Sequence, residues 1–171
     1  MKPLGFLATS VLRLRFAVWR IVYRSYARRY DISPGFRFNG VGISLYGDGR
    51  IELGDDSYIS EYASVHACAG QVVRIGRRCR IANHVRIYTE TSEPDSDFRT
   101  SEGTPVRGNV MIGDGVWLGV NVYIGPGITI GSNSVVGANS VVTKDVPAGE
   151  IWGGVPARRI RAKVLEGLHS K

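Results

Sequence analysis

The sequence predicts an all-β fold in which the chain winds into a parallel β-helix, with an amphipathic α-helix before it and a short polar tail after it. Three observations predict this fold. Aliphatic residues recur at every sixth position through much of the 171-residue chain, small residues recur four positions after them, and the first 30 residues mix apolar side chains with arginines. We expect the helix over residues 1–30, the β-helix domain over 31–163 and the tail over 164–171.

The helix segment carries all of the net charge of +7, because the remaining residues hold fifteen basic and fifteen acidic side chains. It has seven basic residues and no acidic one. Arginines interrupt every apolar run, so we expect neither a membrane-spanning helix nor a cleavable secretory signal. Two roles stay open: the helix lies on an anionic membrane surface, or it caps the open end of the β-helix. Nucleic acid is not an expected partner, because no companion reading module is present.

The β-helix is predicted by a period of six, which fits neither an α-helix nor an ordinary strand. The chain must turn a corner once in each repeat, or hexad. The opening residues of twelve hexads are all aliphatic, and they are Leu53, Ile59, Val65, Ile75, Ile81, Ile87, Ile112, Leu118, Ile124, Ile130, Val136 and Val142.

The fifth residue of each hexad is never larger than isoleucine, which is typical of a position inside a narrow shaft. These residues are Ser57, Ala63, Ala69, Cys79, Val85, Thr91, Val116, Val122, Ile128, Ser134, Ser140 and Val146. Glycine often follows the opening residue, and Asp, Asn or Ser often come next, as corners require. The pattern therefore predicts three short strands and three tight corners per turn, with turns stacked about 4.8 Å apart.

The register breaks between Val65 and Ile75 and again between Ile87 and Ile112, and loops on a rigid scaffold are where sites usually lie. The chain has three histidines. His66 is expected at the corner where the long loop leaves, one turn from Tyr88. His84 is expected at the preceding corner, one turn from Tyr62, and His169 falls in the tail. Each fits a corner residue without function, but His66 and His84 also flank the expected cleft.

Three C-terminal stretches, "IGDGVWLG" (112–119), "GANSVVTKDVP" (137–147) and "GGVPARRIR" (153–161), resemble the acetyl-coenzyme A-binding stretches of the hexapeptide-repeat acyltransferases. The likeness is to the galactoside, maltose and polysaccharide O-acetyltransferases, and it covers residues 53–163. It implies a left-handed β-helix, acetyl-coenzyme A as the donor, and a homotrimer with sites at subunit boundaries.

The resemblance also implies residue roles on the donor side. Trp117 would lie beside the thioester, and Gly119 and Ala138 would line the pantetheine groove. The nucleotide and its phosphates would meet Thr143, Lys144, Arg158 and Arg161. A lysine and two arginines suit a ligand with several phosphate charges, although they also fit the solvated end of a basic tail. We expect no metal.

The sequence departs from the family at the catalytic histidine. The family has a phrase similar to "YTATHPLD", and this chain reads "YTETSEPD", with Ser92 in the place of the histidine. Serine cannot take a proton near neutral pH. His66 is therefore the first candidate for the base and His84 the second. On the acceptor side we expect Tyr88, Glu90, Ser92 and Asp95.

The predicted function is acetyl-coenzyme A-dependent O-acetylation of a sugar hydroxyl during synthesis of a cell-surface polysaccharide, such as lipopolysaccharide O-antigen, capsule or exopolysaccharide. A histidine would take the hydroxyl proton while backbone amides hold the oxyanion. Two alternatives stay open: N-acetylation of a nucleotide-linked amino sugar, and a non-catalytic trimeric scaffold. Cys68 and Cys79 form no disulfide framework, so we expect a cytoplasmic protein, peripheral on the inner face of the membrane if the helix binds lipid.

Overall fold

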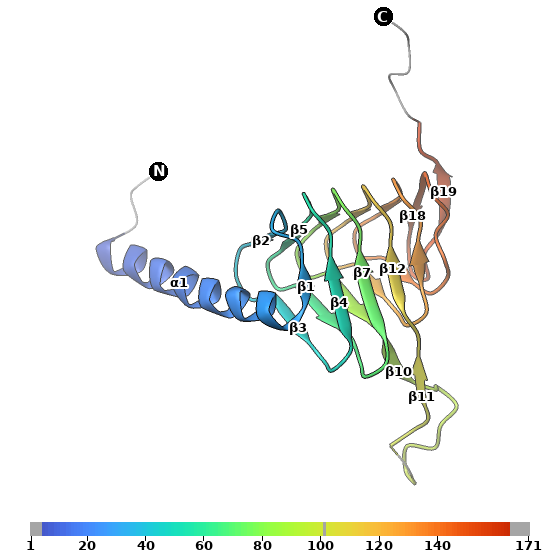
Figure 1. The fold of residues 1–171 in the computed structure, drawn as a ribbon. Helices are drawn as coiled ribbons and strands as arrows, with labels where there is room; N and C mark the ends of the chain where they lie inside the picture. Colours follow the sequence, from blue (N-terminus) through green and yellow to red (C-terminus); the bar gives the residue numbers. More distant parts are fainter. Residues whose placement is uncertain (1–4, 101, 165–171) are drawn as a thin grey trace, which may run out of the picture.

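The computed structural model describes residues 5–100 and 102–164, and it is a β-solenoid of about five turns with one N-terminal helix. Helix α1 (Phe6–Arg29) runs out from the first turn, and the strands wind away from it toward the C-terminal end (Figure 1). The predicted β-helix is thus confirmed. His169 and most of the predicted tail lie outside the described residues, as does Lys2, one of the seven basic residues of the helix segment.

Three sheets form the three sides of the coil, and we call them sheets A, B and C in the order in which the chain visits them. Sheet A consists of β1 (Asp31–Ile32), β4 (Arg50–Leu53), β7 (Val72–Ile75), β12 (Val110–Ile112) and β15 (Thr129–Ile130). Sheet B consists of β2 (Arg37–Asn39), β5 (Tyr58–Ser60), β8 (Arg80–Ile81), β13 (Trp117–Leu118), β16 (Val135–Val136), β18 (Glu150–Gly153) and β19 (Arg158–Ala162). Sheet C consists of β3 (Ser44–Tyr46), β6 (Ser64–His66), β9 (Arg86–Tyr88), β14 (Tyr123–Ile124) and β17 (Val141–Val142).

The chain passes from sheet A to B to C and returns to A, so each turn is a triangle with one corner between each pair of sheets. Successive coils pair in parallel, as Val65 with Ile87 and Ile124 with Ile87 show in sheet C. The corner between sheets C and A lies on the opposite side of the triangle from sheet B.

The core confirms the hexad pattern. All twelve predicted opening residues are at most 2% exposed, and ten of the twelve predicted fifth residues are buried. Ser57, Ser134 and Ser140 are buried among them, and each hydroxyl donates to a backbone carbonyl, for example Ser57 Oγ to Gly76 O at 2.7 Å. The shaft therefore accepts small polar side chains without leaving their hydroxyls unpaired.

Two predicted fifth residues, Ala69 and Thr91, are exposed, so those predictions were wrong. The reason is local: the chain leaves the coil after His66 and after Tyr88, before the hexad is complete. Thr91 lies in a hairpin formed by β10 (Glu90–Ser92) and β11 (Pro105–Arg107), which projects from the corner between sheets C and A (Figure 1). The interior is filled instead by Ala67 and Thr89, both fully buried.

The predicted N-terminal helix is confirmed, and its C-terminal half caps the first coil. Trp19 and Tyr26 pack against the core, and the Tyr23 ring stacks on Phe38 with centroids 4.4 Å apart. The Tyr23 hydroxyl donates to Gly40 O at 3.0 Å and accepts from Ile43 N at 3.3 Å. The helix therefore satisfies backbone groups that the end of a β-helix would otherwise leave unpaired. The described residues contain no helix that is long and apolar enough to cross a membrane.

We expect Tyr23→Phe to lower the free energy of unfolding by about 1–3 kcal/mol, because the substitution keeps the stacked ring but removes the partner of two backbone groups. Chemical denaturation would measure this loss. Tyr62→Phe is the control, because Tyr62 is 44% exposed and its hydroxyl accepts only from the exposed Arg15 side chain and from no backbone group. We expect a change within about 0.5 kcal/mol. Equal stabilities for the Tyr23→Phe variant and the unsubstituted protein would contradict the capping role.

Candidate functional site

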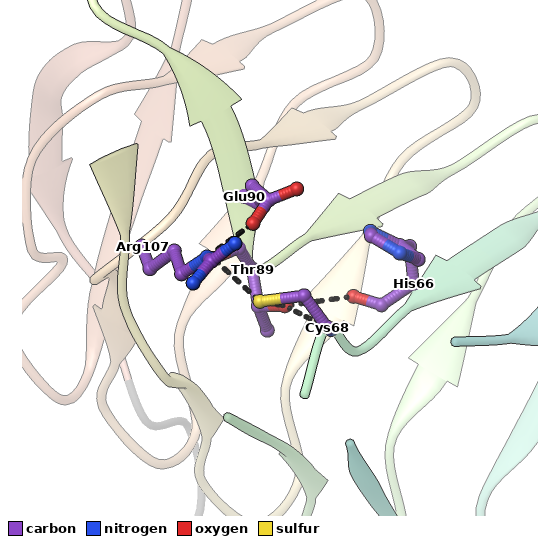
Figure 2. A network of polar contacts seen from close by, with 5 residues as sticks. All are labelled: His66, Cys68, Thr89, Glu90 and Arg107. Carbon is purple, nitrogen blue, oxygen red and sulfur yellow. Dashed lines mark hydrogen bonds and ion pairs between the residues drawn. The ribbon is translucent and has the colours of Figure 1, made fainter. Parts of the chain in front are cut away.

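The hairpin corner is held together by a buried threonine (Figure 2). Thr89 Oγ1 accepts a hydrogen bond from Cys68 N at 2.9 Å and lies 3.3 Å from His66 O, to which it donates. The backbone of Thr89 also bonds to His66 O and to Gly108 N. Thr89 thus ties the short loop after His66 to both ends of the hairpin, and it fixes where His66 stands relative to the hairpin.

A carboxylate stands beside His66 at the base of the hairpin. Glu90 and Arg107 face each other across β10 and β11 and form an ion pair. The hydrogen bond from Arg107 lowers the pKa of the Glu90 carboxyl, and a weaker Coulombic contribution from His66 acts in the same direction. Glu90 is therefore an anion at neutral pH, on the same side of the coil as His66 (Figure 2).

His66 also belongs to a row of rings on the outer surface of sheet C. Its ring lies 4.8 Å from the Tyr46 ring and 6.1 Å from the Tyr88 ring, measured between centroids. The Tyr88 hydroxyl is 3.2 Å from Ser64 Oγ. Burial and the neighbouring Tyr88 raise the pKa of Tyr46 to about 12, so this phenol stays protonated at neutral pH. The row offers half-exposed rings and hydroxyls, a surface on which a sugar could stack and form hydrogen bonds.

His84 lies elsewhere, at the corner between sheets B and C. It is exposed, has a φ of 60°, and stacks on the Tyr62 ring with centroids 5.2 Å apart and an interplanar angle of 14°. The guanidinium of Arg15 lies 5.7 Å from the same Tyr62 ring, on which it makes a cation–π contact. The two candidate bases therefore occupy two different corners of one protomer.

The predicted acceptor residues are only partly brought together. Glu90 and Ser92 line a hollow of about 310 Å³ in the hairpin, together with Glu102 and Arg107. Tyr88 lies instead in the row of rings on sheet C. Asp95 is exposed in the loop between β10 and β11.

A larger groove lies across the outer surface of sheet B. It has a volume of about 830 Å³ and contains Trp117 and Arg161, as predicted for the donor, between further cationic and apolar side chains. Its lining residues are Arg78, Arg80, Gly115, Trp117, Val135, Ile151, Arg161, Lys163 and Val164. The indole of Trp117 is prominent in it, since this residue is 54% exposed. The groove combines an aromatic surface with four cations.

The other predicted donor residues lie in three places. Gly119 and Ala138 are adjacent at the corner between sheets B and C, and a Cβ on Gly119 would come within 2.6 Å of Ala138 N. Thr143 and Lys144 follow β17 at the corner between sheets C and A, and both are exposed. Arg158 stands at the opposite end of β19 from Arg161. One protomer therefore does not gather all seven residues around one groove.

Sequence reasoning missed Arg78, Arg80 and Lys163 in the groove, and Thr89 at the hairpin. A signal for Arg80 was available, because it precedes Ile81 as Trp117 precedes Leu118. Aligned hexads would have placed the two side chains side by side on sheet B, where the structure pairs them. Within residues 5–100 and 102–164, no group of three or more histidines, cysteines or acidic residues could hold a metal ion.

Comparison with known proteins agrees with this architecture. Residues 109–144 match the family model described as bacterial transferase hexapeptide (six repeats). A hexapeptide-repeat acetyltransferase of Vibrio cholerae O1 biovar eltor, solved with acetyl-coenzyme A, is 28% identical with a TM-score of 0.71, over 90% of this chain and 85% of that one. A maltose O-acetyltransferase of Clostridium difficile 630 is 28% identical with a TM-score of 0.70, over 94% of this chain and 90% of that one.

A galactoside acetyltransferase solved with coenzyme A is 32% identical with a TM-score of 0.56. The likeness covers 78% of this chain and 62% of that chain. By its repeat and its fold, the chain resembles the hexapeptide-repeat acetyltransferases.

Proposed function

We propose that this protein transfers the acetyl group of acetyl-coenzyme A to a hydroxyl of a sugar, in the cytoplasmic synthesis of a cell-surface polysaccharide. The observation that carries the proposal is the groove on sheet B, in which Trp117 stands among Arg78, Arg80, Arg161 and Lys163. A coenzyme A molecule has several phosphate charges on a long, partly apolar arm. Guanidinium groups bind phosphates well, and an exposed indole gives the arm a surface to pack on.

The names of the similar proteins favour a sugar as the acceptor, since two of them are a maltose and a galactoside acetyltransferase. The row formed by Tyr46, His66 and Tyr88 gives a sugar ring aromatic faces to stack on and hydroxyls to bond with. A polysaccharide precursor of the O-antigen, capsule or exopolysaccharide type is the acceptor class that we propose. Both cysteines are free and buried, in keeping with a cytoplasmic location.

In the proposed reaction, His66 takes the proton of the sugar hydroxyl as its oxygen attacks the thioester carbonyl carbon. The carbon–sulfur bond then breaks, and the thiolate leaves and takes up the proton, so that an acetyl ester and free coenzyme A are the products. Backbone amides would stabilise the oxyanion that forms in between. Glu90, whose carboxyl pKa is lowered by its ion pair with Arg107, supplies a negative charge at this corner. The related enzymes have a catalytic histidine at the position of Ser92, and in this proposal His66 does the work of that histidine.

The proposed site is shared between copies of the chain. His66 and the hairpin stand at the corner between sheets C and A, whereas the groove lies on sheet B, on the opposite side of the same triangle. A base on one protomer cannot reach a thioester held on the far side of that protomer. A closed homotrimer in which each hairpin corner meets the sheet B surface of its neighbour would give three equivalent sites.

Arg161→Ala should weaken coenzyme A binding by about 10-fold, because one charge-assisted hydrogen bond to a phosphate would be lost. Isothermal titration with coenzyme A would measure the effect. Arg159→Ala is the matched control, since Arg159 lies on the same strand but pairs with Glu150 outside the groove. Unchanged binding in the Arg161 variant would contradict the assignment of the groove.

His66→Ala should lower turnover by roughly 100-fold or more, the usual scale for a lost general base, while coenzyme A affinity stays unchanged. His84→Ala should keep turnover within a few-fold. Thiol release would be followed with free sugars, nucleotide-linked sugars and amino sugars as acceptors. Full activity of His66→Ala on a hydroxyl acceptor would exclude His66 as the base.

The acceptor panel also separates the alternative functions. A preference of the unsubstituted protein for an amine would favour N-acetylation, and no turnover of any acceptor would favour the non-catalytic scaffold.

Mixed trimers test whether the site is shared. Chains carrying His66→Ala and chains carrying both Trp117→Ala and Arg161→Ala should each be inactive alone. When the two are co-expressed, random assembly would give an intact His66 corner facing an intact groove at about one site in four. We therefore expect the mixture to regain about a quarter of the unsubstituted activity. A mixture as inactive as its parents would show that each protomer holds its own site.

A further inference from the structure

Helix α1 extends beyond the solenoid, and its N-terminal half presents an apolar surface that the cap does not use (Figure 1). Five aliphatic residues recur at alternating intervals of four and three, and they form one stripe along the helix. The members of this apolar stripe are Leu7, Val11, Leu14, Val18 and Ile21. They are 80%, 61%, 67%, 50% and 67% exposed. Trp19, Tyr23 and Tyr26, which pack on the first coil, lie on a different side of the helix.

A row of arginines lies directly beside the apolar stripe on the helix surface. It consists of Arg13, Arg20, Arg24 and Arg28, and all four are exposed. Within the described part of the chain, the only ion pair made by the helix is the one between Arg29 and Asp48. Among the described residues, the four arginines of the row therefore have no anionic side chain within ion-pair distance. Arg20 and Arg24 also line an open hollow of about 350 Å³ between the helix and the first coil.

We infer that the apolar stripe and the arginine row of α1 bind the surface of an anionic lipid bilayer. The aliphatic side chains would enter the boundary between headgroups and acyl chains, and the arginines would stay among the lipid phosphates. The helix would lie in the plane of the surface, as amphipathic helices with a basic face do. The same helix caps the solenoid with its C-terminal half, so it joins the β-helix to the membrane.

The charge of α1 decides whether its apolar stripe binds a membrane or a second copy of the helix. Apolar residues spaced by four and three can also form the seam of a coiled coil, and such seams are usually flanked by charges of opposite sign. The helix has no acidic residue. Packing its copies stripe to stripe would bring arginines together without a counter-ion, whereas an anionic membrane supplies the missing negative charge.

Vesicle binding of the full-length protein tests the inference. With vesicles of phosphatidylcholine and phosphatidylglycerol, we expect co-sedimentation at least about 10-fold stronger than with phosphatidylcholine alone, and a marked loss of binding at high salt. Equal binding to both vesicle types, or no binding to either, would overturn the inference.

Two leucine variants locate the surface. Leu14→Gln places a polar group in the apolar stripe and should weaken binding to the anionic vesicles by about 10-fold, on the scale of one buried leucine side chain. Leu12→Gln is the matched control, because Leu12 is 41% exposed on another side of the helix, and it should bind like the unsubstituted protein. Equal losses in the two variants would contradict a lipid-binding stripe.

Sedimentation without vesicles tests the other occupant. A fall in oligomer mass for Leu14→Gln, with unchanged vesicle binding, would show that the apolar stripe binds a second copy of the chain and would overturn the inference.

Discussion

The narrow interior shaft is the constraint on which the rest of the structure depends. Each side of each turn contributes one aliphatic residue and one small residue to the shaft, and every coil rests on its neighbours through parallel pairing. Ile87 shows the result: it is fully buried between Val65 on one coil and Ile124 on the next. An extra residue within a strand would turn aliphatic side chains outward and break pairing on both sides. Insertions must therefore leave the coil at a corner.

The corner between sheets C and A accepts such insertions in two consecutive coils, which places the loop after His66 directly beside the base of the hairpin. Thr89 fixes this arrangement. Its hydroxyl oxygen accepts a hydrogen bond from Cys68 N, and its backbone N–H donates to His66 O, so the two coils stay paired at this corner. The stacking of coils thus converts a separation of more than twenty residues into side-chain proximity. Glu90 and His66 face the same region for that reason, although neither has any local motif.

The hexad period predicted most of the solenoid, since burial of the opening residues depends on spacing alone. It failed at Ala69 and Thr91, because a period cannot show where a chain will leave its register. The first coil was also absent from the pattern, because it does not continue the aliphatic column. Phe38 packs on Tyr23 and Tyr26 of α1, and the Phe36 ring meets Phe38 edge-on. The division of α1 into a capping half and a projecting half depends on those tertiary contacts, so the sequence left both roles open. Of the residues that line the groove on sheet B, only Trp117 and Arg161 had been named from the sequence. The resemblance points to motif residues and not to their neighbours on adjacent coils.

The same geometry explains why the proposed chemistry falls between protomers. A short strand of the coil directs one residue inward and only one or two outward, as β13 does with Leu118 and Trp117. A single flat face can therefore provide a shallow groove and a row of side chains, but it has no second wall to enclose a reaction and exclude water. The hairpin is a wall of this kind, and in its own protomer it stands at the corner opposite the groove. A fold with flat faces and projecting corner loops is suited to building enclosed sites by bringing the corner of one copy against the face of another.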